Sequence, residues 1–171
     1  MNRTKVLSGL LAAALIGVPA LSPSPALAAG GPNLAAGKPA TASSTNANFV
    51  AANVTDGNPD TYWHTNYGLT LAKYPHVLEF DLVDAGTLTG FTLLPRQDGN
   101  SNGRIKNYEF SISDDRKSWK PVKSGAFPDN GNLQKVKFDQ AVKGRYVRFS
   151  AVSEQHDQDF ASAAEIGFLS E

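Results

Sequence analysis

The chain has 171 residues, in which 16 basic residues (Lys and Arg) balance 16 acidic residues (Asp and Glu), and it has no cysteine. The balanced charge, without a basic run, argues against a nucleic-acid partner and against membrane attachment through polybasic segments. Because disulfide bonds are impossible, the folded protein must depend on packing, or on a bound metal, for its stability.

The first residues are typical of a secretory signal peptide. Arg3 and Lys5 precede an apolar stretch from Val6 to Val18, and prolines and the triplet ALA (residues 26–28) follow. This order predicts cleavage after Ala28. The apolar stretch is shorter than the roughly 20 residues that span a bilayer, so it favours export over a membrane anchor. We expect a signal peptide over residues 1–28, a single domain over residues 29–171 and a secreted protein.

The remainder of the chain is patterned as short β-strands. After an extended entry segment, apolar and polar residues alternate in short runs that are separated by clusters of Gly, Asn, Asp and Pro. Alternation of period two in such runs predicts antiparallel strands. The predicted strands cover residues 76–82, 89–94, 106–113, 133–139, 145–152 and 163–169, with at most one helical turn in residues 49–54. The expected fold is all-β, an antiparallel β-sandwich with Trp63 and Trp119 in its core.

Three long polar connections, residues 56–74, 96–105 and 153–162, are the places where a rigid sandwich would carry function. Motifs in these connections and beside them occur in a recognisable order. They are ANVTDGNPDTYW (52–63), VLEFDL (77–82), PRQDG (95–99), NGRIKNY (102–108), SDD (113–115) with Trp119, GRYVR (144–148) and AAEI (163–166). Together they resemble the discoidin, or coagulation-factor type C, domains, and most of all the family 32 carbohydrate-binding modules. The resemblance covers about residues 33–169 and implies a jelly-roll sandwich of the galactose-binding-like kind.

The resemblance also implies a sugar site. The residues that it indicates are His64, Tyr67, Arg96, Asn102 and Phe160. Polar side chains would fix the hydroxyls and Phe160 would stack on the sugar ring, while Tyr67 stands where relatives often carry Trp. Four of these residues also have a structural explanation: a loop hydrogen bond for His64, an ion pair of Arg96 with Asp98, a turn at Asn102 and core packing for Phe160. Taken together they predict binding of glycans that end in galactose or N-acetylgalactosamine, by a monomer.

A second group of residues is rich in oxygen donors. The turn at residues 56–61 fits a calcium ion, which takes six to eight oxygen ligands, and equally fits a solvated turn in which Asp56 caps backbone amides. The resemblance implies a structural calcium site. Its ligands would be the carbonyls of Asn53 and Ala164 together with Asp56, Asn58, Thr61 and Glu165. Glu165 lies in an apolar segment, where an unpaired carboxylate is costly.

We expect no catalysis. Paired carboxylates can hydrolyse glycosides, but Asp114 and Asp115 fall in a turn, and Asp157 and Asp159 fall in a polar loop without apolar neighbours that would raise a pKa. The sequence contains no nucleophile elbow, zinc-spaced histidines or phosphate-binding loop. The remaining alternative is a discoidin-type domain that binds a protein or a lipid at the cell surface. Polar loop tips at residues 98–102 and 154–158 favour a hydroxyl-rich ligand over a membrane.

Overall fold

Two long, curved strands organise the structure, a computed structural model that describes residues 33–68 and 71–170. They are β3 (His76–Leu94) and β6 (Gln134–Ala151). Around them lie β1 (Ala40–Ala42), β2 (Trp63–His64), β4 (Asn107–Ser113), β5 (Lys120–Ala126), β7 (Ser162–Ala163), β8 (Glu165–Leu169) and a short 3-10 helix, η2 (Ala51–Thr55). The predicted signal peptide lies outside the described residues.

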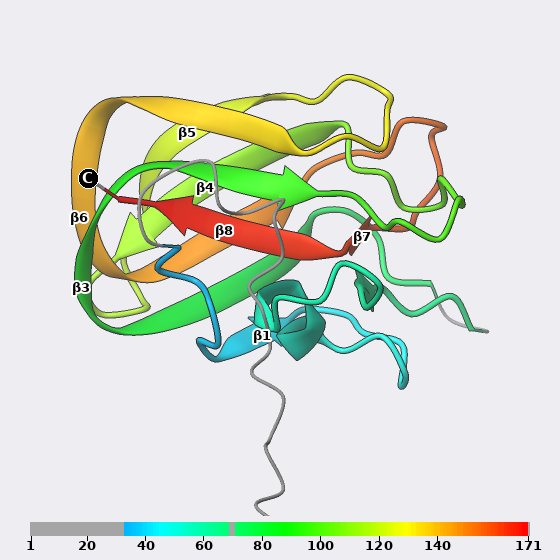
Figure 1. Cartoon of the computed structure of the whole chain (residues 1–171), viewed down its shortest axis with the longest axis horizontal. Helices are drawn as coiled ribbons and strands as arrows, with labels where there is room; N and C mark the ends of the chain where they lie inside the picture. The colour runs from blue at the N-terminus through cyan, green and yellow to red at the C-terminus, as the bar shows by residue number, and fades with distance from the viewer. Residues whose placement is uncertain (1–32, 69–70, 171) are drawn as a thin grey trace, which may run out of the picture.

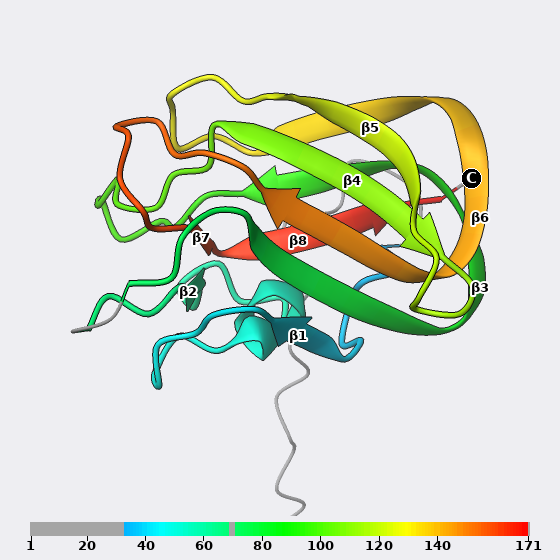
Figure 2. The same ribbon diagram turned by 180° about the vertical axis from the view of Figure 1, so that it is seen from behind.

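Both long strands contribute to two layers of the sandwich. The first part of β3 (residues 76–81) pairs with β1 and with residues 146–151 of β6, which in turn pair with β4. The second part (residues 86–94) pairs with β8 and with residues 134–144 of β6. A shift in register between Asp81 and Gly86 marks the bend of β3, where both long strands turn around one end of the molecule (Figures 1 and 2).

Aromatic side chains from the two layers meet in the core. The rings of Phe80 and Phe168 contact edge to face, with centroids 4.9 Å apart, and Phe91 stacks on Phe110 at 5.0 Å. Each pair joins one layer to the other, and all four side chains are fully buried. Truncating one such ring to alanine costs about 3–5 kcal/mol, so this cluster is a principal source of stability in a chain without disulfides.

The structure confirms the predicted antiparallel sandwich and corrects several details. Strands predicted separately over residues 76–82 and 89–94 form one continuous strand, β3, and β6 likewise unites two predicted segments. Strand β5 was not predicted, because its sequence, KPVKSGA, is largely exposed and lacks apolar alternation. The helical turn is present as η2. No helix among residues 33–68 and 71–170 has the length and hydropathy to cross a membrane.

The prediction for the two tryptophans is half right. Trp63 is fully buried, and its Nε1 donates to the Ser44 carbonyl at 2.9 Å. Trp119 is only partly buried, and the Arg148 guanidinium lies 4.0 Å from the centroid of one of its rings. A cation above an indole is favourable in water, which allows Trp119 to lie on the outside of the sheet instead of in the core.

Candidate functional site

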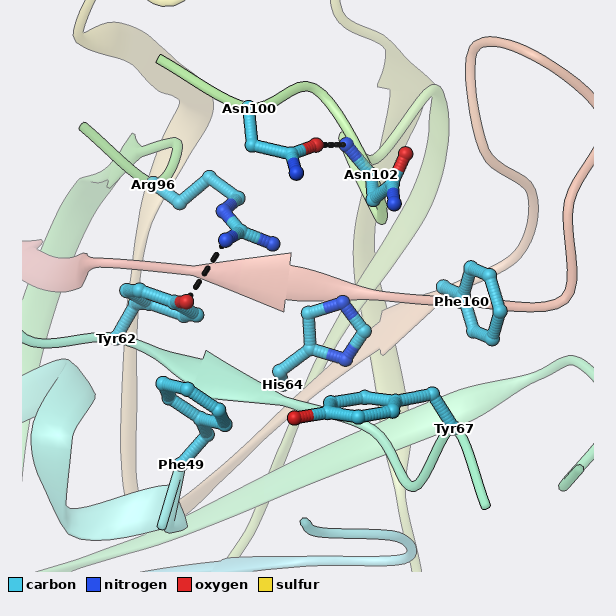
Figure 3. A pocket seen from close by; sticks show the side chains of 8 residues that line it. All are labelled: Phe49, Tyr62, His64, Tyr67, Arg96, Asn100, Asn102 and Phe160. Atoms are coloured by element: carbon cyan, nitrogen blue, oxygen red, sulfur yellow. Dashed lines mark hydrogen bonds between the residues drawn. The ribbon is translucent and has the colours of Figure 1, made fainter. Parts of the chain in front are cut away.

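A pocket of about 380 Å³ opens among the loops at the end of the sandwich opposite the bend of the long strands (Figures 1 and 3). Its lining residues are Phe49, Tyr62, His64, Tyr67, Arg96, Asn100, Asn102 and Phe160. All five residues predicted for the sugar site are among them. The structure therefore brings together side chains from three distant connections.

The short strand β2 places two of these side chains. Its Trp63 and His64 pair with Ala163 and Ser162 of β7. Successive side chains on a strand point to opposite faces, so the burial of Trp63 turns Tyr62 and His64 together toward the pocket. The other edge of β2 is held by the turn before η2, because the His64 amide donates to the Phe49 carbonyl at 3.1 Å. This contact brings Phe49 to the pocket as well.

The hydrogen bonding of His64 determines what its ring offers a ligand. Its Nδ1 lies 2.7 Å from the Thr65 carbonyl, which can only accept, so Nδ1 carries the proton and Nε2 is an acceptor in the neutral ring. Burial lowers the pKa of His64 below its usual 6.5, against the opposing effect of the Thr65 hydrogen bond. At neutral pH the ring is therefore uncharged and presents one acceptor, which suits the hydroxyl group of a ligand.

Arg96 follows β3 and is held on several sides. Its Nε donates to Asp98 Oδ1 at 2.7 Å, and its Nη2 donates both to Asp98 Oδ2 and to the Tyr62 hydroxyl, the latter at 2.7 Å. The guanidinium carbon also lies 4.3 Å from the centroid of the Tyr62 ring, whose other face stacks on Phe49. Among the described residues none accepts a hydrogen bond from Nη1, so its two N–H groups remain for a ligand.

The loop between Arg96 and β4 presents two asparagines. The Asn102 amide donates to Asn100 Oδ1 at 2.9 Å, and the Asn100 amide donates to Asp98 Oδ1 at 3.2 Å, so consecutive side chains shape the loop (Figure 3). The side-chain amide of Asn102 has no hydrogen-bond partner among residues 33–68 and 71–170. It can therefore both donate to a ligand and accept from one.

Gly103 lets this loop approach the aromatic wall of the pocket. Its φ is +79°, and a Cβ at this position would lie 2.8 Å from backbone atoms of Ala161 and Ser162. The close approach allows two hydrogen bonds between the segments. The Ser162 amide donates to the Gly103 carbonyl at 2.8 Å, and Ser162 Oγ donates to the Asn102 carbonyl at 2.9 Å. Only glycine fits this conformation and this space.

Phe160 forms the far wall and is fixed through the backbone around it. The Tyr74 hydroxyl donates to the Phe160 carbonyl, and His76 Nε2 donates to the Asp159 carbonyl at 2.8 Å. On the other side, the Ala161 amide donates to Thr65 Oγ1 at 3.1 Å, while the Thr65 amide donates to the Ala161 carbonyl at 2.9 Å. The wall is therefore anchored to segments on both sides of residues 66–73.

The aromatic surface continues from Phe160 along the pocket. The His64 ring lies 5.7 Å from the Phe160 ring and meets the Tyr67 ring edge to face at 5.2 Å. Tyr67 is 49% exposed, so its ring forms an open rim. Sequence reasoning missed three lining residues: Phe49, Tyr62 and Asn100. The alternation in Tyr62-Trp63-His64 was the available signal, because a buried Trp63 implies that Tyr62 shares the face of His64.

The residues predicted to bind calcium lie around the turn after η2. Asp56 caps this turn, accepting from the Asn58 amide at 2.8 Å and from Thr61 Oγ1 at 2.7 Å. Asn58 Oδ1 accepts from the Asp60 amide at 3.1 Å. The alternative explanation, a turn capped by Asp56, is thus present in the structure. Ala164, between β7 and β8, and Glu165, the first residue of β8, join this region, since β8 packs against η2.

Glu165 is the unusual member of this group. Its side chain is 1% exposed, and neither carboxyl oxygen has a hydrogen-bond partner of acceptable geometry among the described residues. Burial and the neighbouring Asp56 carboxylate together raise the pKa of Glu165 to about 8, against the opposing effect of the Gly57 and Asn58 amides. A cation between Asp56 and Glu165 would remove the cost of this arrangement. The donors present fit a calcium ion.

A hydrogen bond connects the predicted calcium ligands to the pocket. Asn53 Nδ2 donates to the Tyr62 carbonyl at 2.9 Å. Asn53 belongs to the predicted calcium ligands, and Tyr62 lies beneath Arg96 in the pocket. The turn at residues 56–61 therefore leads directly to Tyr62 and then into β2, which carries His64.

Comparison with known proteins identifies relatives of the whole domain. The family model of the F5/8 type C domain matches residues 39–166. A galactose oxidase of Gibberella zeae is 41% identical over 113 residues, which are 65% of this chain and 16% of that protein. A sialidase of Micromonospora viridifaciens is 37% identical over 118 residues, 68% of this chain and 18% of the sialidase. The match thus spans under a fifth of either enzyme's length.

Solved structures give the same result. The module CpGH89CBM32-5 of Clostridium perfringens, in complex with GalNAc-β-1,3-galactose, is 30% identical with a TM-score of 0.73, covering 78% of this chain and 96% of the module. The family 32 carbohydrate-binding module of Clostridium perfringens NanJ, in complex with galactose, is 28% identical with a TM-score of 0.68, covering 77% of this chain and 92% of the module.

Proposed function

Because this chain belongs to the F5/8 type C (discoidin) domain family, we propose that it is a non-catalytic carbohydrate-binding module that recognises galactose or N-acetylgalactosamine at the ends of glycans. The observation that carries the proposal is the pocket, where polar groups that are free to bind a ligand lie opposite an aromatic wall. They are His64 Nε2, the Nη1 donors of Arg96, the side-chain amide of Asn102 and the ring of Phe160.

This set of groups suits a pyranose. A sugar ring has an apolar face, which packs on an aromatic ring, and hydroxyls, which each donate and accept hydrogen bonds. The pocket supplies an acceptor at His64, donors at Arg96 and both at Asn102. Because Arg96 and His64 are held by Asp98 and the Thr65 carbonyl, little side-chain freedom is lost when a ligand binds. Two similar modules were solved with galactose-containing ligands, which supports the choice of sugar.

The absence of catalysis is part of the proposal. None of the described residues that line the pocket is a carboxylate, and in Asp98, which pairs with Arg96 beside it, the hydrogen bonds from Arg96 hold the pKa at about 2. Such a group is ionised at neutral pH and cannot serve as a general acid, and its oxygens are occupied by Arg96 and the Asn100 amide. The similarity to galactose oxidase and sialidase covers a single domain of each, so their reactions give no reason to expect an activity here.

We also propose that Asp56 and Glu165, with Asn58, Thr61 and the carbonyls of Asn53 and Ala164, hold a structural calcium ion. The support is the buried carboxylate of Glu165, which has no hydrogen-bond partner among the described residues and lies beside a second carboxylate. Calcium would supply charge neutralisation at this position and would tie the turn after η2 to β8, two segments far apart in sequence. Export remains a proposal that depends on residues 1–28.

A glycan array followed by calorimetric titration tests the proposed function. Wild-type protein is expected to retain glycans ending in galactose or N-acetylgalactosamine, and Arg96→Ala is expected to lose them. For a monosaccharide of roughly a dozen heavy atoms, about −0.3 kcal/mol per atom gives roughly −4 kcal/mol, or a Kd near ~1 mM. Failure to retain any galactosylated glycan would refute the proposal.

A further inference from the structure

The charge balance of the pocket is set by a single pair of residues. Among the eight described residues that line it, Arg96 is the one that carries a formal charge at neutral pH, because the His64 ring is neutral and the remainder are Phe, Tyr and Asn. The Arg96 side chain is only 9% exposed, so its charge is poorly screened by water. Its counter-ion, Asp98, lies outside the lining, with a side chain that is 39% exposed.

Asp98 is placed to neutralise Arg96 and to hold its orientation. Both carboxylate oxygens bind the guanidinium, one through Nε at 2.7 Å and the other through Nη2. A planar guanidinium and a carboxylate joined at two points form the most directional ion pair available to side chains. Oδ1 also accepts from the Asn100 amide, so Asp98 is fixed by the loop as well as by Arg96.

We propose that Asp98 is a specificity-determining residue that makes the pocket select neutral sugars over acidic ones. This inference rests on the proposed function. With Asp98 in place, the Nη1 donors of Arg96 face the ligand while the pair has no net charge. A carboxylated sugar such as galacturonate would gain little from Arg96 and would be repelled by the nearby Asp98 carboxylate. Without Asp98, the same pocket would hold one unbalanced positive charge and would favour the anion.

The expected effect is large enough to measure. A neighbouring charge in a partly buried site changes the equilibrium of an ionised group by about tenfold or more. The ratio of galactose to galacturonate affinity should therefore change by at least about tenfold when the Asp98 charge is removed. Asp98→Asn is the suitable variant, because its amide oxygen can still accept from Arg96 and from the Asn100 amide while the charge is gone.

The test is a set of titrations at low ionic strength with methyl β-galactoside and methyl β-galacturonide, which differ only at the sixth carbon. Wild type, Asp98→Asn and a second variant, Asp98→Ser, are each titrated with both sugars, and their melting temperatures are checked. Asp114→Asn is the matched control, because it removes one negative charge from an exposed turn between β4 and β5. The Asp98 variants should gain relative affinity for the galacturonide, and added salt should reduce that gain.

The outcomes separate the two proposals. If wild type binds neither sugar, the proposed function itself fails. If wild type binds the galactoside but the affinity ratio in both folded Asp98 variants equals that of wild type and Asp114→Asn, the galactose proposal stands and the role of Asp98 is wrong. Equal affinity of wild type for the two sugars at low salt would also overturn the inference. A tenfold shift toward the galacturonide in both folded Asp98 variants, absent from Asp114→Asn, supports it.

Discussion

The Tyr74 hydroxyl donates to the carbonyl of Phe160, 86 positions further along the chain. Tyr74 is partly buried beside β3, and Phe160 lies in the connection that leads to β7. The contact fixes the backbone at the residue whose ring forms the far wall of the pocket. The next residue but one, His76, fixes Asp159 in the same way. A polar contact between two framework segments thus determines the position of an aromatic side chain.

Replacement of Tyr74 by phenylalanine tests this relationship. The variant removes the hydroxyl and leaves the Phe160 carbonyl without its partner, which costs about 1–3 kcal/mol when such a group stays buried. We expect galactose affinity to fall several-fold, because the Phe160 wall is less well fixed. Tyr146→Phe is the control, since it makes the same chemical change on the outer face of the sheet. Titration calorimetry gives the comparison, and equal affinities in the two variants would rule out a positioning role for Tyr74.

Gly103→Ala is expected to damage both the fold and the pocket. The new Cβ would lie 2.8 Å from backbone atoms of Ala161 and Ser162, at a φ of +79° that alanine rarely adopts. The backbone strain alone costs roughly 1–3 kcal/mol, so the melting temperature should fall by several degrees. Gly131→Ala, where a Cβ has no neighbour within 4 Å, should be tolerated. Calorimetric melting curves would contradict this account if the two variants melted together.

Sugar binding should weaken in acid through His64. Its pKa is lowered by burial, so the neutral ring is favoured in the folded protein and protonation becomes harder than in the unfolded chain. The stability that this shift contributes is present above pH 6.5 and is lost as the pH falls through the lowered pKa. A sugar hydroxyl that donates to Nε2 requires the neutral ring, so the sugar should bind that form preferentially.

The measurement is the galactose Kd between pH 7.5 and pH 4.5. Wild type should lose affinity progressively below pH 6.5, whereas His64→Gln should bind more weakly at neutral pH with a flatter profile. His76, whose pKa is also lowered by burial, is present in both proteins and contributes equally. Equal galactose affinity of wild type and His64→Gln at neutral pH, where the His64 ring is uncharged, would show that the His64 acceptor has no part in binding.

The effect of Glu165→Gln on the melting temperature should depend on calcium. Without calcium the variant should be at least as stable as wild type, and with calcium it should be less stable. In chelator, wild type keeps a buried carboxyl group beside Asp56, while the glutamine amide can donate to Asp56, so the variant should melt at the same temperature or higher. With calcium at 100 times its Kd, the wild type gains about 2.7 kcal/mol and should melt several degrees above the variant. A wild-type melting temperature that calcium and chelator leave unchanged would argue against the metal site.

Part of this architecture could be read from the sequence because its signals are local. Alternation in segments such as residues 76–82 and 145–152 reports which face of a strand is buried, and that was sufficient for an antiparallel sandwich. The continuity of β3 was hidden, because residues 83–88 contain Asp, Gly and Thr and read as a turn. In the structure the antiparallel pairing with β6 resumes at Gly86, after a shift in register.

The sequence indicated pocket residues that lie in the long polar connections. It did not indicate the residues that reach the pocket through a backbone contact or through the alternation of a strand. His64, Arg96 and Phe160 stand in polar connections, where the resemblance to the family indicated them as sugar-site residues. Phe49 reaches the pocket only through a backbone hydrogen bond to β2, and Tyr62 through the alternation of a two-residue strand. Trp119 was misplaced because its partner, Arg148, comes from a strand that is distant in sequence.

The most direct test of the account is an amide chemical-shift titration of the full chain with galactose, measured by two-dimensional nitrogen-15 NMR. The account predicts fast-exchange shifts that saturate with a Kd near ~1 mM, concentrated at residues 62–67, 96–103 and 159–163. The same titration of Arg96→Ala should give no saturable shifts in these segments. Unchanged wild-type spectra at saturating galactose, or shifts confined to another face of the sandwich, would contradict the assignment of this pocket as a galactose site.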